Sequence, residues 1–182
     1  MNVSNRKVHK FIGLVVSVQL LLWTISGLFF SFNKIDQIRG ENYLKSVEQV
    51  TPQKISRISF DEAKELVIEK TYLKPISVEE ITEEKRGSEF RGRNLPLYKL
   101  SSLDSSDKEV NVYIDPSLGK IVAIRTFEWR LWDLMWGLHI MDWRDRDDIN
   151  NLLLKIFSIL ALISSITGII LFLSLIHISE PT

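Results

Sequence analysis

The residues best suited to chemistry in this chain are two histidines, His9 and His139. A neutral imidazole is a good ligand for haem iron, and its ordinary pKa lies close to physiological pH. His9 stands among basic residues just before a long apolar run, and His139 stands a short distance before a second one. Each histidine can be interpreted as an axial haem ligand or as a polar residue at a membrane–water boundary.

The segment around His139 is rich in aromatic residues and holds four of the chain's five tryptophans. Tryptophan favours the membrane interface because its ring is apolar while its N–H needs a polar partner. If this segment is a helix, its spacing places five residues on one broad face: Trp129, Trp132, Trp136, His139 and Trp143. This pattern predicts an interfacial helix that seats a domain on the bilayer. The alternative is an aromatic face that packs on haem or quinone, with Met135 or Met141 as further iron ligands.

Acidic and basic residues alternate directly after this segment, at Asp142, Arg144, Asp145, Arg146, Asp147 and Asp148. Clustered carboxylates can bind a hard cation, but the interleaved arginines favour a solvated, self-paired linker. The chain has no cysteine, which excludes disulfides, thiolate metal sites and cysteine nucleophiles. Its 23 basic and 23 acidic residues form no basic stripe, so we expect no nucleic-acid partner.

Two uncharged apolar runs, Phe11 to Phe32 and Ile156 to Ile176, must position these residues. Each is long enough to cross about 30 Å of hydrocarbon as a helix, and neither has a polar face. Arg6, Lys7 and Lys10 precede the first run without an acid, so we expect a cytoplasmic N-terminus and an extracytoplasmic middle domain. The rival interpretation of the first run is a cleaved signal peptide.

Polar and small residues interrupt the two apolar runs. Gln19 is costly in lipid, so we expect it to face another helix. Close helix packing is the expected use of Ser26, Gly27, Ser164, Ser165, Thr167 and Gly168. A helix from His9 to Phe32 is roughly 35 Å long. With the middle domain outside, His9 and His139 are expected at opposite membrane faces. One chain then cannot clamp a single haem between them, although a symmetric dimer could pair each histidine with its own copy.

The middle domain is predicted to be α+β. Ser59 and Glu62 form a capping box, and the helix that they start should end near Tyr72, before Pro75. Glu83 to Asn94 is predicted to be a loop or an exposed hairpin. Antiparallel strands are predicted at Ile76 to Ile81, Leu95 to Leu100, Val110 to Ile114 and Lys120 to Ile124. Leu66, Val67, Val110, Val112 and Ile114 should share the core, with the third strand buried on one face.

The segments ISFDEAKELVIEK and VNVYIDPSLGKIVAI resemble a PepSY domain, with its I-S-x-x-E-A helix start and V-Y-I-D-x-x-x-G-K-I hairpin. The flanks around His9 and His139 resemble PepSY-associated transmembrane proteins. The resemblance implies an extracytoplasmic module without catalytic residues. It also implies links to siderophore or ferric-iron reduction, and haem held by membrane histidines. Some relatives continue into a cytoplasmic reductase domain.

With the two apolar runs, the resemblance implies a bacterial inner-membrane protein of an iron-uptake, siderophore-reduction or electron-transfer system. The alternative is a non-catalytic extracytoplasmic binding or regulatory module, such as a peptidase partner. Expected partners are the lipid bilayer and a second copy or a partner membrane protein or reductase. The predicted segments are a cytoplasmic tail 1–10, a first span 11–32, a connector 33–54, a PepSY-like domain 55–126, a tryptophan-rich interfacial segment 127–150, a second span 151–176, and a tail 177–182 that resembles translated sequencing adapter.

Overall fold

The computed structural model describes residues 3–45 and 57–178, with side chains from 9 to 45 and from 57 to 173. Predictions for the side chains of Arg6 and Lys7, for the second half of the connector and for the tail 177–182 lie outside the described side chains. The chain forms two compact parts. The sheet part is Phe30–Met135, and the helical part combines Met1–Phe29 with Trp136–Thr182.

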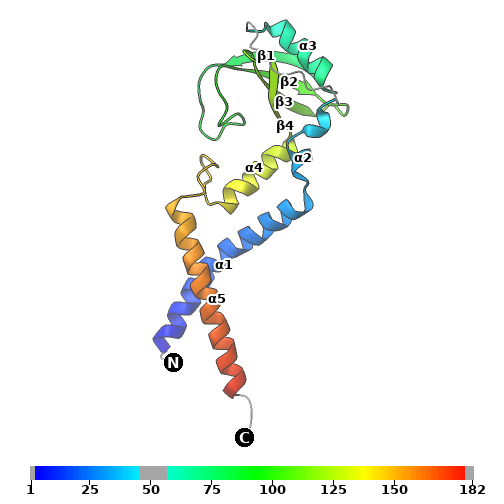
Figure 1. The fold of residues 1–182 in the computed structure, drawn as a ribbon. Helices are drawn as coiled ribbons and strands as arrows, with labels where there is room; N and C mark the ends of the chain where they lie inside the picture. Colours follow the sequence, from blue (N-terminus) through cyan, green and yellow to red (C-terminus); the bar gives the residue numbers. More distant parts are fainter. Residues whose placement is uncertain (1–2, 46–56, 179–182) are drawn as a thin grey trace. The chain divides into compact units, whose positions relative to one another are not determined.

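The sheet part is an antiparallel four-stranded sheet with strand order β1-β2-β3-β4, and helix α3 crosses one of its faces (Figure 1). This arrangement confirms the predicted α+β fold. In chain order the elements of this part are α2 (Ile35–Ile38), η1 (Glu41–Tyr43), α3 (Phe60–Lys70), β1 (Lys74–Ile81), β2 (Leu97–Leu103), β3 (Glu109–Asp115) and β4 (Lys120–Arg125). Helix α4 (Phe127–His139) begins in the sheet part and ends in the helical part.

The start of α3 confirms the predicted capping box. The Glu62 N–H donates to Ser59 Oγ, and the Ser59 N–H donates back to the Glu62 carboxylate at 2.7 Å. Two otherwise unpaired helix donors are therefore satisfied by local side chains. The helix ends at Lys70, and the Thr71 hydroxyl donates to the Val67 carbonyl at 2.7 Å. Local sequence signals are enough to set both ends of this helix.

The main core lies between α3 and the sheet. The predicted residues Val67, Val110, Val112 and Ile114 are all buried in it, and Leu66 packs against it while partly buried. Leu100 of β2 and Val112 of β3 are opposite each other and are fully shielded from solvent. Burial of such side chains contributes about 1.5–3 kcal/mol each, which makes this layer the main source of stability for the sheet part.

The opposite face of the sheet is also covered, which corrects the prediction of a half-buried third strand. Phe90, from the loop between β1 and β2, packs with Leu97, Tyr113 and Ala123 in a second cluster. Asn111 and Tyr113 both donate to the Glu89 carboxylate of the same loop, at 2.8 and 3.0 Å. The segment from Glu83 to Asn94 is therefore a covering loop, and no strand forms in it.

Strand β2 begins at Leu97, two residues later than predicted, and continues to Leu103. Pro96 lies just outside the strand because it has no N–H to donate to a neighbouring strand. The extension reflects pairing on both sides, since Leu103 pairs with Lys74 of β1 and with Glu109 of β3.

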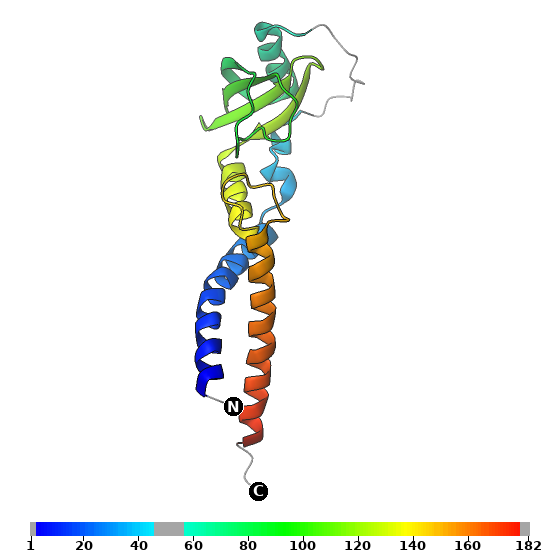
Figure 2. The ribbon, with the colours of Figure 1, turned by 90° about the vertical axis from the view of Figure 1, so that its left-hand side faces the viewer.

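The helical part contains α1 (Val3–Phe32) and α5 (Leu152–Ile178), which lie alongside each other in Figure 2. His9–Phe32 and Leu152–Leu173 are long and apolar enough to cross a membrane. A Cβ added at Gly13 of α1 would lie 3.8 Å from Ser164 Oγ of α5, so close packing occurs there. At Gly27 and at Gly168 an added Cβ would meet no atom of this chain within 4 Å, so close packing at these two glycines stays a prediction.

Candidate functional site

His139 is the last residue of α4, at a helix end with well-defined backbone geometry. The Asp142 N–H donates to the Gly137 carbonyl at 3.0 Å, and Met141 has a left-handed φ of 57°. This is a Schellman-type ending in which methionine occupies the position that usually favours glycine. Met141 is buried, so packing holds a backbone conformation that costs a non-glycine residue energy.

Side chains from α1 and from the start of α5 satisfy the carbonyl groups at this helix end. Gln19 Nε2 donates to the Leu138 carbonyl at 3.3 Å, and Trp23 Nε1 donates to the His139 carbonyl at 2.6 Å. Asn151 donates to the Ile140 carbonyl at 2.9 Å. The last carbonyls of a helix have no intrahelical partner, and leaving them unpaired away from water is costly. The buried Gln19 thus faces another helix, as predicted.

The ring of His139 is oriented by the buried hydroxyl of Ser26, which lies 2.7 Å from Nδ1. Ser26 Oγ also lies 2.7 Å from the Leu22 carbonyl, which can only accept. When the hydroxyl donates its single proton to that carbonyl, the His139 Nδ1 carries the hydrogen of the shared contact. The tautomer that results has its lone pair on Nε2, the nitrogen that would face a metal.

Two aromatic rings flank this imidazole. Trp136 stacks on it with ring centroids 6.5 Å apart and an interplanar angle of 11°, and Trp23 lies 6.4 Å away at 50°. Burial lowers the pKa of His139, because the imidazolium form loses hydration in these surroundings. The site therefore favours neutral imidazole, which is the protonation state that binds iron.

His9 has the same arrangement near the other end of the helices. Thr167 Oγ1 lies 2.9 Å from His9 Nδ1 and donates to the Ile163 carbonyl at 2.8 Å. As at Ser26, when the Thr167 hydroxyl donates to that carbonyl, His9 carries its hydrogen on Nδ1 and its lone pair on Nε2. The rise along α1 from position 9 to position 26 is about 25 Å. The structure therefore brings each histidine to its own hydroxyl partner and does not bring the two histidines together.

Asp142, the first of the aspartates after α4, organises the turn that follows the helix. Asp142 accepts main-chain N–H groups from Arg144, Asp145, Asp147 and Asp148, at 3.0 to 3.3 Å. Partial burial opposes ionisation, but these four donors together lower the pKa of Asp142. Its oxygens organise a turn instead of a cation site. The described side chains contain no cluster of three or more His, Cys, Asp or Glu that could hold a metal ion.

The predicted tryptophan face is divided between the two parts of the molecule. Trp129 is buried in the sheet part, with the Arg125 guanidinium 4.2 Å from its ring centroid. Trp132 packs on Phe30 at 5.5 Å, and Trp136 stacks on His139. Trp143 is 56% exposed and lies beyond the end of α4, because the chain leaves the helix at Met141.

Three functional contacts could not be read from the sequence. Ser26 and Thr167 were predicted only as packing residues, although they orient the histidines. The buried pair of Arg91 and Asp133, with Arg91 also near the Trp129 ring, holds α4 to the loop between β1 and β2. For Ser26 and Thr167, the only signal in the sequence was a hydroxyl residue within an apolar run.

The comparisons with known proteins agree with the motifs. A family described as PepSY-associated TM region matches residues 6–176, which include both long apolar helices and the whole sheet. No curated protein matches the chain, and no solved structure matches it.

Proposed function

The chain belongs to the PepSY-associated TM region family and is a membrane protein, and we propose that it serves an iron-uptake or electron-transfer system of the bacterial inner membrane. Haem is the group that we propose for its two histidine sites. When bound, haem would supply an iron that takes up and releases single electrons. The observation that carries this proposal is the shared arrangement of His9 and His139, each with Nδ1 within hydrogen-bond distance of a helix hydroxyl.

The surroundings of His139 have features that a haem ligand needs and that a purely structural histidine does not. Metal-ligating histidines usually donate their second N–H to an oxygen, which fixes the ring and the tautomer. Trp23 and Trp136 provide flat apolar surfaces beside the imidazole, of the kind that a porphyrin edge can pack on. The two histidines belong to separate sites along α1. We propose that a second copy of the chain or a partner membrane protein supplies the opposite ligand at each.

The proposed orientation places the N-terminus in the cytoplasm and the sheet part outside. It rests on Arg6, Lys7 and Lys10 before the first apolar run, where the sequence has no acid. The chain has no cysteine, so single cysteines at Asn2 and at the exposed Glu84, in the loop that contains Arg91, can report on the two sides. An impermeant thiol reagent added from the periplasmic side should label position 84 and leave position 2 unlabelled. The reverse pattern would overturn the orientation.

The haem proposal is tested by the visible spectrum of membranes from haem-replete cells that express the chain. We expect a Soret band that His139→Ala and His9→Ala each reduce or shift, with the double substitution abolishing it. His177→Ala removes the third histidine of the chain and is the matched control. Ser26→Ala should keep the band but alter its position, because it releases Nδ1 without removing the ligand. Absence of a Soret band, or a band unchanged by both ligand substitutions, would refute haem binding.

A second candidate function is a non-catalytic module that binds an extracytoplasmic protein, such as a peptidase. The observation that favours it is β1, an edge strand whose Ile76 is 62% exposed. Edge strands can pair with a strand from another protein. A colourless preparation, together with β1 amides that exchange more slowly when a purified partner is added, would favour this function over the first.

A further inference from the structure

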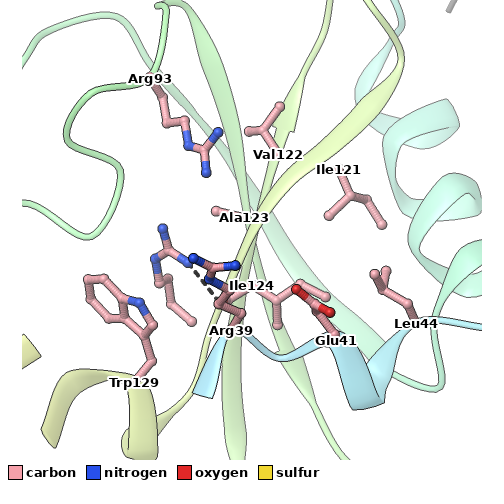
Figure 3. A pocket seen from close by; sticks show the side chains of 10 residues that line it. Arg39, Glu41, Leu44, Arg93, Ile121, Val122, Ala123, Ile124 and Trp129 are labelled. Carbon is pink, nitrogen blue, oxygen red and sulfur yellow. Dashed lines mark hydrogen bonds between the residues drawn. The ribbon is translucent and has the colours of Figure 1, made fainter. Parts of the chain in front are cut away.

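A hollow of about 360 Å³ lies along β4, between Ile121 and Arg125. The α2–η1 segment contributes Arg39 and Glu41 to its lining, and the loop before β2 contributes Arg93. Figure 3 shows Arg39, Arg93 and Trp129 around the same stretch of the strand. All the lining residues belong to the sheet part, so the hollow is a feature of one compact part.

The charge of this hollow is unbalanced. Three guanidinium groups, those of Arg39, Arg93 and Arg125, face a single lining carboxylate, Glu41. Within the described part of the chain, the Arg39 and Arg93 side chains form neither an ion pair nor a hydrogen bond. Arg125 donates to the main-chain carbonyls of Glu89 and Ile124, at 2.9 and 3.1 Å, which leaves its charge without a direct acid partner.

Other arginines of the same part behave differently. An ion pair with a carboxylate forms at Arg57 with Glu80, at Arg91 with Asp133, and at Arg130 with Glu89. The sheet part therefore pairs arginines where acids are available and leaves unpaired cations concentrated at this hollow. Burial, together with the neighbouring charges of Arg93 and Arg91, lowers the pKa of Arg125 to about 10, although the charge of Glu89 opposes this shift. Burial and neighbouring positive charges both disfavour the charged guanidinium, and a bound anion would stabilise it.

The Arg125 guanidinium is also held in place before any ligand arrives. It lies over the Trp129 ring at 4.2 Å, and its Nε is fixed by the Glu89 carbonyl. A cation held over an aromatic face loses little conformational freedom on binding an anion. The planar fork of a guanidinium matches the two oxygens of a carboxylate or a phosphate.

We propose that the hollow beside β4 is a binding site for a small oxyanion with two or more negative charges, a polycarboxylate or a phosphate ester. Arg39 and Arg93 would contact the anion from the two sides, and Arg125 would contact it from the strand. Glu41 would oppose binding and limit it to ligands with more than one negative charge. The proposal is independent of haem, because no histidine lines the site.

The test is isothermal titration calorimetry on the full chain in detergent micelles at constant ionic strength. Citrate is the polycarboxylate probe, inorganic phosphate is the phosphate probe, and acetate is the singly charged comparison. We expect citrate or phosphate to bind at least about tenfold more tightly than acetate, and more weakly as salt is raised. Binding of citrate alone identifies a polycarboxylate ligand, and binding of phosphate alone identifies a phosphate ester.

Substitutions at exposed positions then assign the binding to the hollow. Arg39→Gln and Arg93→Gln should each weaken binding about fivefold or more, whereas Glu41→Gln should strengthen it about twofold to threefold. Arg86→Gln removes an exposed arginine of the same loop that does not line the hollow, and it should leave the affinity unchanged. Unchanged melting temperatures would show that the variants are folded. No measurable heat with either probe, or equal affinity in the Arg39, Arg93 and Arg86 variants, would overturn the proposal.

Discussion

The sheet part buries a large apolar core, whereas the long helices of the helical part leave most of their large apolar side chains exposed. The largest fully buried residues of the sheet part include Leu97, Leu100 and Ile114. The described length of α1 buries Val16 together with the polar Gln19 and Ser26, while Leu14 and Leu21 are at least 60% exposed. Water drives apolar side chains inward, but a hydrocarbon solvent does not distinguish between an apolar neighbour and a lipid tail. The difference in burial therefore reflects the solvent around each part.

The same difference changes what specifies each structure. In the sheet part, shape depends on filling a core, so the volumes of side chains matter. In the helical part, hydrogen bonds that involve Gln19, Trp23 and Ser26 hold the end of α4 to α1. Such bonds are worth only about 0.6 kcal/mol on average between membrane helices. The helical part should thus respond weakly to changes in apolar volume and more clearly to the loss of a polar group.

The largest expected effect concerns Asp133, the most deeply buried charged residue that the structure describes in the sheet part. Asp133 is 1% exposed and pairs with Arg91. Asp133→Ala leaves Arg91 without its acid partner in a mostly buried position, and it should lower the free energy of unfolding by about 3–5 kcal/mol. The measurement is urea unfolding of the full chain in detergent. Glu79→Ala, which breaks the exposed pair with Lys99, is the control and should cost about 1 kcal/mol or less. Equal effects would show that burial does not decide the strength of these pairs.

The second prediction compares equal volume changes in the two parts. Leu100→Ala opens a cavity in the sheet core and should cost about 2–5 kcal/mol. Leu21→Ala removes the same atoms from an exposed position of α1 and should change stability by less than about 0.5 kcal/mol. Thermal unfolding of both variants in the same detergent measures the contrast. If Leu21→Ala lowers stability as much as Leu100→Ala, then Leu21 packs against protein in the native assembly. A second subunit would then have to cover this face of α1.

The parts of the structure that could be predicted are those set by neighbouring residues. The capping box at Ser59, the end of α3, the β3–β4 hairpin and both apolar helices follow from residues a few positions apart. The fold class followed from the order of these signals. The candidate ligands His9 and His139 were also identified, because a histidine beside an apolar run is recognisable without any structure.

The rest depends on contacts between distant segments, which no local pattern encodes. Ser26 lies 113 positions from His139, and Thr167 lies 158 positions from His9. Alternation in β3 predicted one buried face, whereas Phe90 and Glu89 of the loop before β2 cover the other. The position after helix α4 that usually favours glycine is occupied by Met141, with a positive φ, so the usual glycine signal for a helix end is missing. The arginine-lined hollow needed three segments to meet.

The third prediction tests the hydrogen bonds of the helical part. Gln19→Leu removes the donor to the Leu138 carbonyl and leaves that carbonyl without this partner. The loss should be about 0.5–2 kcal/mol, smaller than the loss at Leu100 even though both residues are buried. Faster amide exchange near the end of α4, measured by mass spectrometry on the full chain in detergent, would report it. Val16→Ala is the apolar control at a buried position of the same helix, and it should leave exchange near Leu138 unchanged.

The smallest expected effect is a dependence on pH that belongs to the sheet part. Glu89 is partly buried, which opposes ionisation, but contacts from Arg130, Asn111 and Tyr113 lower its pKa below the ordinary 4.5. A carboxyl whose pKa is lower in the folded state stabilises the fold above its unfolded pKa. That contribution is lost as the pH falls below 4.5 and through the pKa of the folded state.

Wild type should therefore exceed Glu89→Gln in melting temperature at pH 7, and this difference in melting temperature should narrow by pH 4 and below. Glu65→Gln, at an exposed position of α3, should show no such narrowing. The hydrogen bonds that involve Gln19, Trp23 and Ser26 include no acid. Amide exchange at the end of α4 should therefore not change with pH in parallel with the difference in melting temperature between wild type and Glu89→Gln. A gap that stays constant from pH 7 to pH 3 would show that the Glu89 carboxylate does not stabilise the loop over β3.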